Sequence, residues 1–290
     1  MKRSMLGVLL VLTFVAVGIA AAPPLTFTFS DVHATKTAQE TDTYGVNNAG
    51  AIAGDYIDSA GIQHAMVIAG KKLTTVDNKK CLTGTAFYAI NSAGTAAGWC
   101  TGTSGNAIAF TWSKGKFTTI AYPKATQTEA TGINDKGHVV GLYFDSASVQ
   151  HGFVKKGSKY TTIDIKGDTS TDAYGINNAD DICVYAINTA GGYSSFLYNG
   201  KTFKPISDPN AGGTGTVAHA PNNKGDIAGT YFDTNGAAQG FLLHKGKYYD
   251  VKDPKANNST RNDGINDKLE MVGRYTPTAG GNFGYKATTK

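Results

Sequence analysis

Short runs of alternating apolar and polar residues, separated by turn residues, recur along the whole chain. In one unit the predicted strands are residues 130–133, 138–144, 150–155 and 159–165. Asn134–Gly137, Asp145–Ala147 and Lys156–Gly157 stand between them, and such residues reverse a chain readily. No stretch offers the roughly 10–15 periodic residues of a helix between strands. The pattern predicts four-stranded antiparallel units and excludes an alternating βαβ layout.

A short motif close to Gly-Ile-Asn-x-x-Gly marks each of these units. Its asparagine recurs at Asn47, Asn91, Asn134, Asn177, Asn222 and Asn266. Successive copies are therefore 43–45 residues apart, which is the size of a four-stranded β-propeller blade. An asparagine side chain can bond the backbone two residues on, so we interpret this residue as a turn former rather than a ligand.

The two ends of the chain complement each other. The sixth unit stops after its third predicted strand, residues 282–286, and the segment 25–32 resembles the missing fourth strand. Phe27–Asp31 matches Tyr160–Asp164 to within a residue. A first strand that completes the last blade would leave no free sheet edge. We therefore predict an all-β, six-bladed propeller of four-stranded blades over 25–290; a linear β-solenoid and two smaller propeller halves are the alternatives.

Composition agrees with this prediction. The chain has 35 Thr and 36 Gly against 12 Leu and 3 Glu, which favours strands and turns over helices. With 41% hydrophobic residues it can form a core, so wholesale disorder is excluded. The net charge is +5 with scattered lysines, so nucleic acid binding is not indicated.

The first 22 residues have the form of a secretory signal peptide. Lys2 and Arg3 precede an apolar stretch from Met5 to Ala22 that ends in small residues. An uncleaved membrane anchor is the alternative. No later segment is apolar enough to cross a bilayer, so we expect a secreted, periplasmic or extracellular protein with no membrane span after cleavage.

Three cysteines fit an exported protein with at most one disulfide. Cys81 and Cys100 flank a predicted hairpin near its open end, so they are the candidate pair. Cys183 takes a position that holds small or apolar residues in the other units, and we interpret it as a buried, inert thiol.

The repeat resembles a known family. Gly-Ile-Asn-x-x-Gly-x-x-x-Gly is followed by His-Ala/Gly-Phe, as at His64–Met66 and His151–Phe153, and then by Phe/Tyr-Thr-Thr-Ile-Asp, as at Tyr160–Asp164. This order resembles the bacterial extracellular HAF repeat family over nearly all of the mature chain. The resemblance implies an exported repeat protein without a defined activity, and it supplies no catalytic residues.

Candidate binding residues follow from the order of strands. The links between blades share one face with the turns after the second strands, and such variable loops usually carry binding sites. The innermost strands place several charged residues toward that mouth of the channel. The candidates are Asp42, Glu129, Asp172, His219, Arg261 and Asp263. Converging carboxylates can hold Ca²⁺, accept sugar hydroxyls or perform acid–base chemistry, and solvated loop carboxylates are the alternative.

No familiar catalytic motif is present in the sequence. We therefore expect a monomeric, non-enzymatic protein that binds an extracellular or envelope glycan or protein on its loop-rich face. No cofactor is expected, with Ca²⁺ as the one alternative. Two other functions stay open: a carbohydrate-active hydrolase or lyase that uses Asp42, Glu129 and Asp172, and a purely structural surface or adhesion protein.

Overall fold

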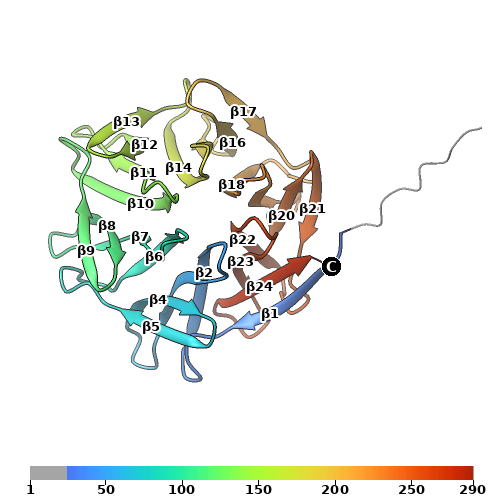
Figure 1. Cartoon of the computed structure of the whole chain (residues 1–290). Helices are drawn as coiled ribbons and strands as arrows, with labels where there is room; N and C mark the ends of the chain where they lie inside the picture. Colours follow the sequence, from blue (N-terminus) through green and yellow to red (C-terminus); the bar gives the residue numbers. More distant parts are fainter. Residues whose placement is uncertain (1–24, 290) are drawn as a thin grey trace, which may run out of the picture.

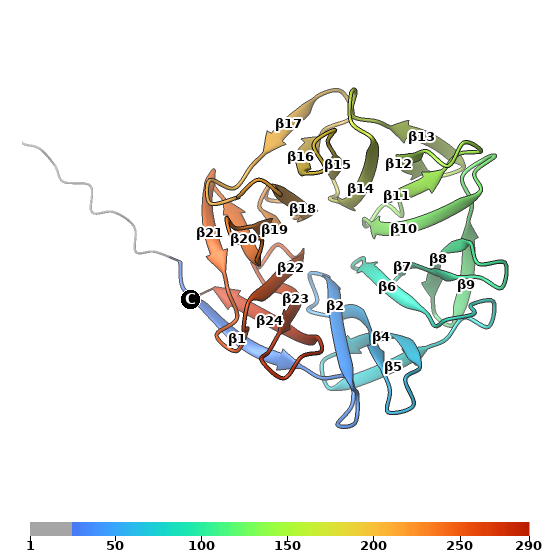
Figure 2. The ribbon, with the colours of Figure 1, turned by 180° about the vertical axis from the view of Figure 1, so that it is seen from behind.

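Six four-stranded antiparallel sheets stand around one central channel in the computed structural model, which describes residues 25–289 (Figure 1). The view from behind shows the same closed ring (Figure 2). Each sheet is a blade, and in five blades the strands follow one another in sequence from the channel outward; in the sixth, the N-terminal strand takes the outermost place. The predicted six-bladed propeller is confirmed, and the solenoid and two-half alternatives are wrong.

The strands agree with the predicted units to within a few residues. Blades one to three comprise β2 (Glu40–Val46), β3 (Ile52–Ile57), β4 (Gln63–Ala69) and β5 (Lys72–Val76); β6 (Ala86–Ile90), β7 (Ala96–Thr101), β8 (Ala107–Ser113) and β9 (Lys116–Ile120); β10 (Gln127–Ile133), β11 (Val139–Phe144), β12 (Gln150–Lys156) and β13 (Lys159–Ile163). Blades four to six comprise β14 (Ser170–Ile176), β15 (Ile182–Ile187), β16 (Tyr193–Tyr198) and β17 (Phe203–Ile206); β18 (Thr216–Pro221), β19 (Ile227–Phe232), β20 (Ala238–His244) and β21 (Lys247–Val251); β22 (Ser259–Ile265), β23 (Met271–Thr276), β24 (Phe283–Thr289) and β1 (Phe27–Val32).

The N-terminal strand closes the last blade, as predicted. β1 runs antiparallel to β24, with Val32 opposite Gly284. The predicted alignment of this strand is wrong by two residues, because Phe29 and not Phe27 takes the place of Tyr160. Phe29 packs edge-on against Tyr285 at 5.4 Å. A slip of two residues keeps every side chain on its face, so the alternation of apolar residues could not detect it.

The hydrophobic core lies between the blades. The third strand of most blades contributes a fully buried residue at the same repeat position. These residues are Met66, Phe110, Phe153, Phe241 and Tyr285. Each cluster joins residues of two neighbouring sheets, so no blade buries its apolar faces alone.

The predicted disulfide joins Cys81 and Cys100, whose Cα atoms are 5.7 Å apart. It ties the link between blades one and two to β7, beside the isolated bridge of Cys81 with Gly102. Cys183 is a free, fully buried cysteine, and burial raises the pKa of its thiol.

The predicted signal peptide, residues 1–22, lies outside the described residues. Between residues 25 and 289 no helix is long and apolar enough to cross a bilayer.

Candidate functional site

A β-bulge in the innermost strand of every blade shapes the channel. The pairing with the second strand shifts at the same place in each blade, for example between Ala173 and Gly175. A bulge adds one unpaired residue and re-aims its side chain. The bulged residues are Tyr44, Tyr88, Thr131, Tyr174, His219 and Asp263, and all six line the channel. All of them except Thr131 line two cavities, one at each end of the channel. The ring of bulged residues therefore lies between the two cavities and divides the channel.

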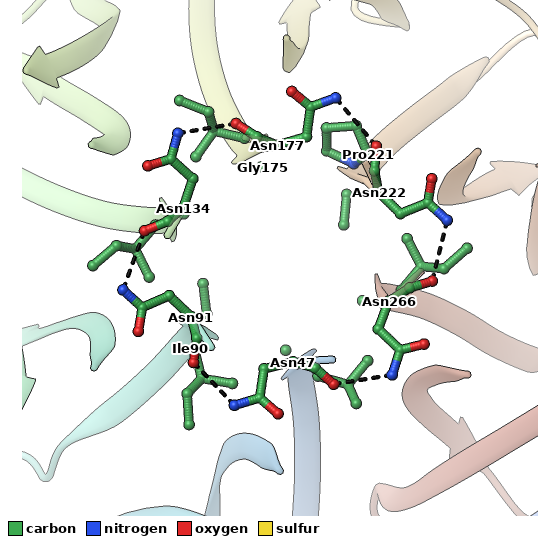
Figure 3. Close-up of a pocket in the computed structure, with 18 of the residues that line it drawn as sticks. Asn47, Ile90, Asn91, Asn134, Gly175, Asn177, Pro221, Asn222 and Asn266 are labelled. Atoms are coloured by element: carbon green, nitrogen blue, oxygen red, sulfur yellow. Dashed lines mark hydrogen bonds between the residues drawn. The ribbon is translucent and has the colours of Figure 1, made fainter. Parts of the chain in front are cut away.

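A circle of six asparagines surrounds one end of the channel (Figure 3). The Nδ2 of each asparagine donates to the main-chain carbonyl oxygen of the asparagine in the next blade, over 2.9–3.1 Å, and the last bond returns to Asn47. The Oδ1 accepts two N–H groups of its own turn, as Asn47 does from Ala49 and Ala51. The predicted turn role is confirmed, but the bond between blades was missed. Aspartate would form the turn equally well. The presence of an amide side chain in all six copies was therefore the sequence signal for the bond between blades.

The other end of the channel is a cavity of about 230 Å³ on the face that carries the links between blades. Aromatic side chains dominate its wall, with two arginines, one aspartate and one histidine among them. It is lined by Tyr44, Tyr88, Tyr174, Tyr185, Tyr193, Val217, His219, Thr230, Phe232, Arg261, Asp263 and Arg274. We call it the link-face cavity. Aromatic rings together with a few convergent polar groups are typical of a ligand site.

One wall of the link-face cavity is a rigid group of rings. Phe232 stacks on Tyr193 with ring centroids 5.6 Å apart, and Tyr193 meets Tyr185 edge-on at 5.9 Å. The Tyr185 hydroxyl donates to the buried carboxylate of Asp172 over 2.7 Å. A bridge between Tyr193 and Gly215 fixes the position of the ring-bearing strand. These contacts hold flat apolar faces toward the cavity before any ligand arrives.

Next to this aromatic group, the wall carries a buried charge network centred on Arg274. Its Nη1 lies 3.3 Å from Oδ2 of Asp263 and its Nε 3.7 Å from Oδ1 of Asp42, while the guanidinium lies over the Tyr44 ring at 4.9 Å. Burial alone would lower the pKa of Arg274, but the two carboxylates and Tyr44 raise it. Arg274 is therefore a charged group held in place by two carboxylates, with further N–H donors left over.

His219 lies in the same wall and is buried. Its Nδ1 is 3.2 Å from Oδ1 of Asp263 and 3.1 Å from the carbonyl oxygen of Asn262. Burial lowers the pKa of this imidazole, and the neighbouring arginines add to that effect although Asp263 opposes it. His219 is thus a neutral hydrogen-bonding group at pH 7.

The structure divides the six predicted site residues into three groups. His219, Arg261 and Asp263 line the link-face cavity. Asp42 instead pairs with Arg274, and Asp172 accepts from Tyr185, so both support lining residues. Glu129 is largely buried; burial and the nearby Asp172 raise its pKa to about 7.

The predicted ring of carboxylates does not form one cluster. Within residues 25–289 no three His, Cys, Asp or Glu residues gather where they could hold a metal ion. Asp42 pairs with Arg274 and Asp172 with Tyr185, so these carboxylates are held at separate places around the channel. The structure therefore provides local supports in place of the expected carboxylate ring.

Sequence reasoning missed nine of the twelve cavity residues, among them four that shape its walls: Arg274, Tyr185, Tyr193 and Phe232. Arg274 lies opposite Arg261 in the strand pair β22–β23, and Tyr185 lies opposite Asp172 in β14–β15. The second strand therefore lines the channel beside the first. A search of second-strand positions opposite the candidates would have found Arg274 and Tyr185, whereas Tyr193 and Phe232 depend on loop conformation.

Fold and cavity define a six-bladed β-propeller with an aromatic and charged channel mouth. No family model matches the chain, and no curated protein matches it. Among solved structures it is similar to the Aleuria aurantia lectin in complex with α-methyl-L-fucoside, with a TM-score of 0.56 and 10% identity over 88% of this chain and 95% of the lectin.

Two further structures show the same likeness. SapL1 lectin in complex with α-methyl fucoside gives a TM-score of 0.55 and 13% identity over 87% of this chain and 93% of that one. TolB from Acinetobacter baumannii gives 0.56 and 9% identity over 83% and 65%. At these identities the likeness shows the shared propeller fold.

Proposed function

We propose that this protein is an exported, monomeric, non-enzymatic glycan-binding propeller whose ligand occupies the link-face cavity. The observation that carries the proposal is the pre-formed aromatic group of Tyr185, Tyr193 and Phe232 beside a set of fixed polar groups in the same cavity. Sugars offer apolar ring faces and a rim of hydroxyls, which such a combination matches.

The polar wall suits hydroxyl recognition. Asp263 and neutral His219 can accept hydrogen bonds, and Arg274 can donate them. All three are held by one another before binding, so little side-chain freedom is lost on association. The fucose lectins of the same fold support a carbohydrate ligand, and the signal-like N-terminus and the HAF-like repeat support export.

The test is a glycan array probed with the mature chain, with and without Ca²⁺, followed by calorimetry on the glycans that bind. Tyr193→Ala removes the central ring of the aromatic wall, and we expect it to weaken binding about 10-fold or more. Tyr249→Ala, on the outermost strand of blade five, is the matched control and should bind like the parent protein.

Two results would contradict the proposal. One is a blank array with folded protein, which would favour a protein partner or a structural role. The other is turnover of a bound glycan that is abolished by Glu129→Gln, which would favour the hydrolase or lyase.

A further inference from the structure

We propose that the link-face cavity selects acidic sugars, and that Arg261 receives the carboxylate of a uronic-acid-type residue. This inference deepens the proposed function and rests on it. Three observations support it. The two arginines of the cavity differ in their ion-pair partners, nearly all other cationic residues of the chain are lysines, and the Thr230 hydroxyl in the cavity wall has no hydrogen-bond partner among the described residues.

Arg261 and Arg274 lie directly opposite each other on β22 and β23. Arg274 has two carboxylate neighbours, Asp263 and Asp42. In the part of the chain that the structure describes, no carboxylate lies within ion-pair distance of Arg261, whose guanidinium lies over the Phe232 ring at 5.9 Å. Arginine stays protonated in proteins, so Arg261 is a permanent cation without a counter-ion at the mouth of a cavity.

The use of arginine at this place is selective. The chain has 27 Lys and Arg residues, of which only Arg3, Arg261 and Arg274 are arginines. Both arginines between residues 25 and 289 line this one cavity. A lysine would serve general surface charge equally well, whereas the planar fork of arginine binds a carboxylate through two parallel hydrogen bonds.

A second polar side chain lines the same cavity. Thr230 lines the cavity on β19, is 1% exposed, and its hydroxyl has no hydrogen-bond partner among the described residues. A buried polar group without a partner costs free energy, and a ligand oxygen placed here would recover it. One uncompensated guanidinium and one free hydroxyl fit one singly charged carboxylate.

The aromatic wall sets the rest of the ligand. Phe232, which lies under Arg261, stacks on Tyr193, so the cation stands at the edge of a flat apolar face. A pyranose on that face places a ring carboxylate beside its edge. An acidic peptide would supply the charge without the flat ring, which is why we favour a sugar.

The experiment compares matched pairs by calorimetry: methyl glucuronide with methyl glucoside, and methyl galacturonide with methyl galactoside. Each pair differs only in a carboxylate for a hydroxymethyl group. We expect the parent protein to prefer the acidic member about 10- to 100-fold, the range typical of a charge-assisted hydrogen bond. Added salt should reduce the preference.

Three variants separate the contributions. Arg261→Gln should bring the acidic-to-neutral ratio near one, and Arg261→Lys should leave an intermediate ratio because the charge remains without the fork. Thr230→Val should lower the ratio a few-fold. Lys204→Gln makes the same change of net charge on β17, far from the channel, and should keep the parent ratio.

The outcomes distinguish the two proposals. Equal binding of both members of each pair, or a ratio that Arg261→Gln leaves intact, overturns the acidic-sugar inference while glycan binding stands. Binding of no sugar by folded protein overturns both. Binding of an acidic peptide without any sugar overturns the inference as well and moves the anion to a protein partner.

Discussion

At the scale of single residues, the buried carboxylates of the first blade have the largest expected effect on stability. Asp55 is 3% exposed and lies across the strand pair from Asp42. Its Oδ2 accepts from Gln63 over 2.8 Å, but its Oδ1 has no partner among the described residues. Burial and the nearby Asp42 raise the pKa of Asp55 from 3.8 to about 7.

This raised pKa predicts a loss of stability with rising pH. Between about pH 4 and 7 the folded protein keeps a proton on Asp55 that the unfolded chain has released. The free energy of unfolding therefore falls through this interval and stays low above it. Asp55→Asn cannot ionise, so it should raise the free energy of unfolding by about 1–3 kcal/mol at pH 8.

Urea unfolding at pH 4.5 and pH 8 measures the effect. At pH 4.5 the variant and the parent should be nearly equal. Asp168→Asn, on the loop between β13 and β14, is the control. A variant that is less stable than the parent at pH 8 would show that the Asp55 carboxylate is compensated in the folded state.

At the scale of elements, the turn after the innermost strand does two things at once. Asn91 accepts the N–H groups of Ala93 and Thr95 and donates to the carbonyl oxygen of Asn134 in the next blade. The same side chain thus forms a turn and joins two sheets. On the opposite face, Oδ1 of Asn188 likewise accepts the N–H groups of Ala190 and Gly192. Among residues 25–289, the Asn188 side chain makes no hydrogen bond to another blade.

Substitutions at these two asparagines separate the turn from the bond between blades. Asn91→Ala should cost about 2–4 kcal/mol of unfolding free energy, and Asn188→Ala about 1 kcal/mol, because only the first loses a buried amide bond between sheets. Asn91→Asp keeps the turn acceptors and loses the donor, so its cost should exceed that of Asn188→Ala. Equal costs for both alanine variants in urea unfolding would show that the bond between blades contributes nothing.

The elements also show how far the sequence could be interpreted. Four strands per unit, the six anchors and the closing strand follow from periods and turn residues, because each unit repeats one local pattern. The bulges do not follow, since an extra residue in a strand leaves no mark on composition. The cavity wall does not follow from the sequence either. Its chemistry depends on which residues outside the innermost strands turn toward the channel, as Arg274 and Phe232 do.

At the scale of the whole molecule, closure depends on a strand from the other end of the chain. β1 pairs with β24 along its entire length and covers an edge that would otherwise be open. Phe29 adds its contact with Tyr285, and Lys255 forms an ion pair with Asp31 of β1. The first and last parts of the propeller are therefore joined by a sheet rather than by the covalent chain.

Removal of residues 25–36 from the mature chain should open the ring. We expect a loss of about 4 kcal/mol or more, seen as a fall in Tm of about 10 °C, together with association through the exposed β24 edge. A synthetic peptide of residues 25–36, added back, should restore the Tm and the monomer, whereas a peptide with the same residues in scrambled order should not. An unchanged Tm after truncation would contradict the role of β1.

The circle of asparagines also sets how many blades this chain can have. Every bond in it has nearly the same length, and glycines at four of the six wall positions allow the next blade to come close: a Cβ at Gly175 would lie 2.3 Å from the carbonyl oxygen of His219. When neighbouring blades are related by the same distance and the same rotation, the ring closes for one number of blades only. A seventh copy would widen the circle and stretch every amide bond, and a fifth would crowd the wall. Gain or loss of a single repeat is thus opposed by geometry at the channel, although each unit is a near copy of the next.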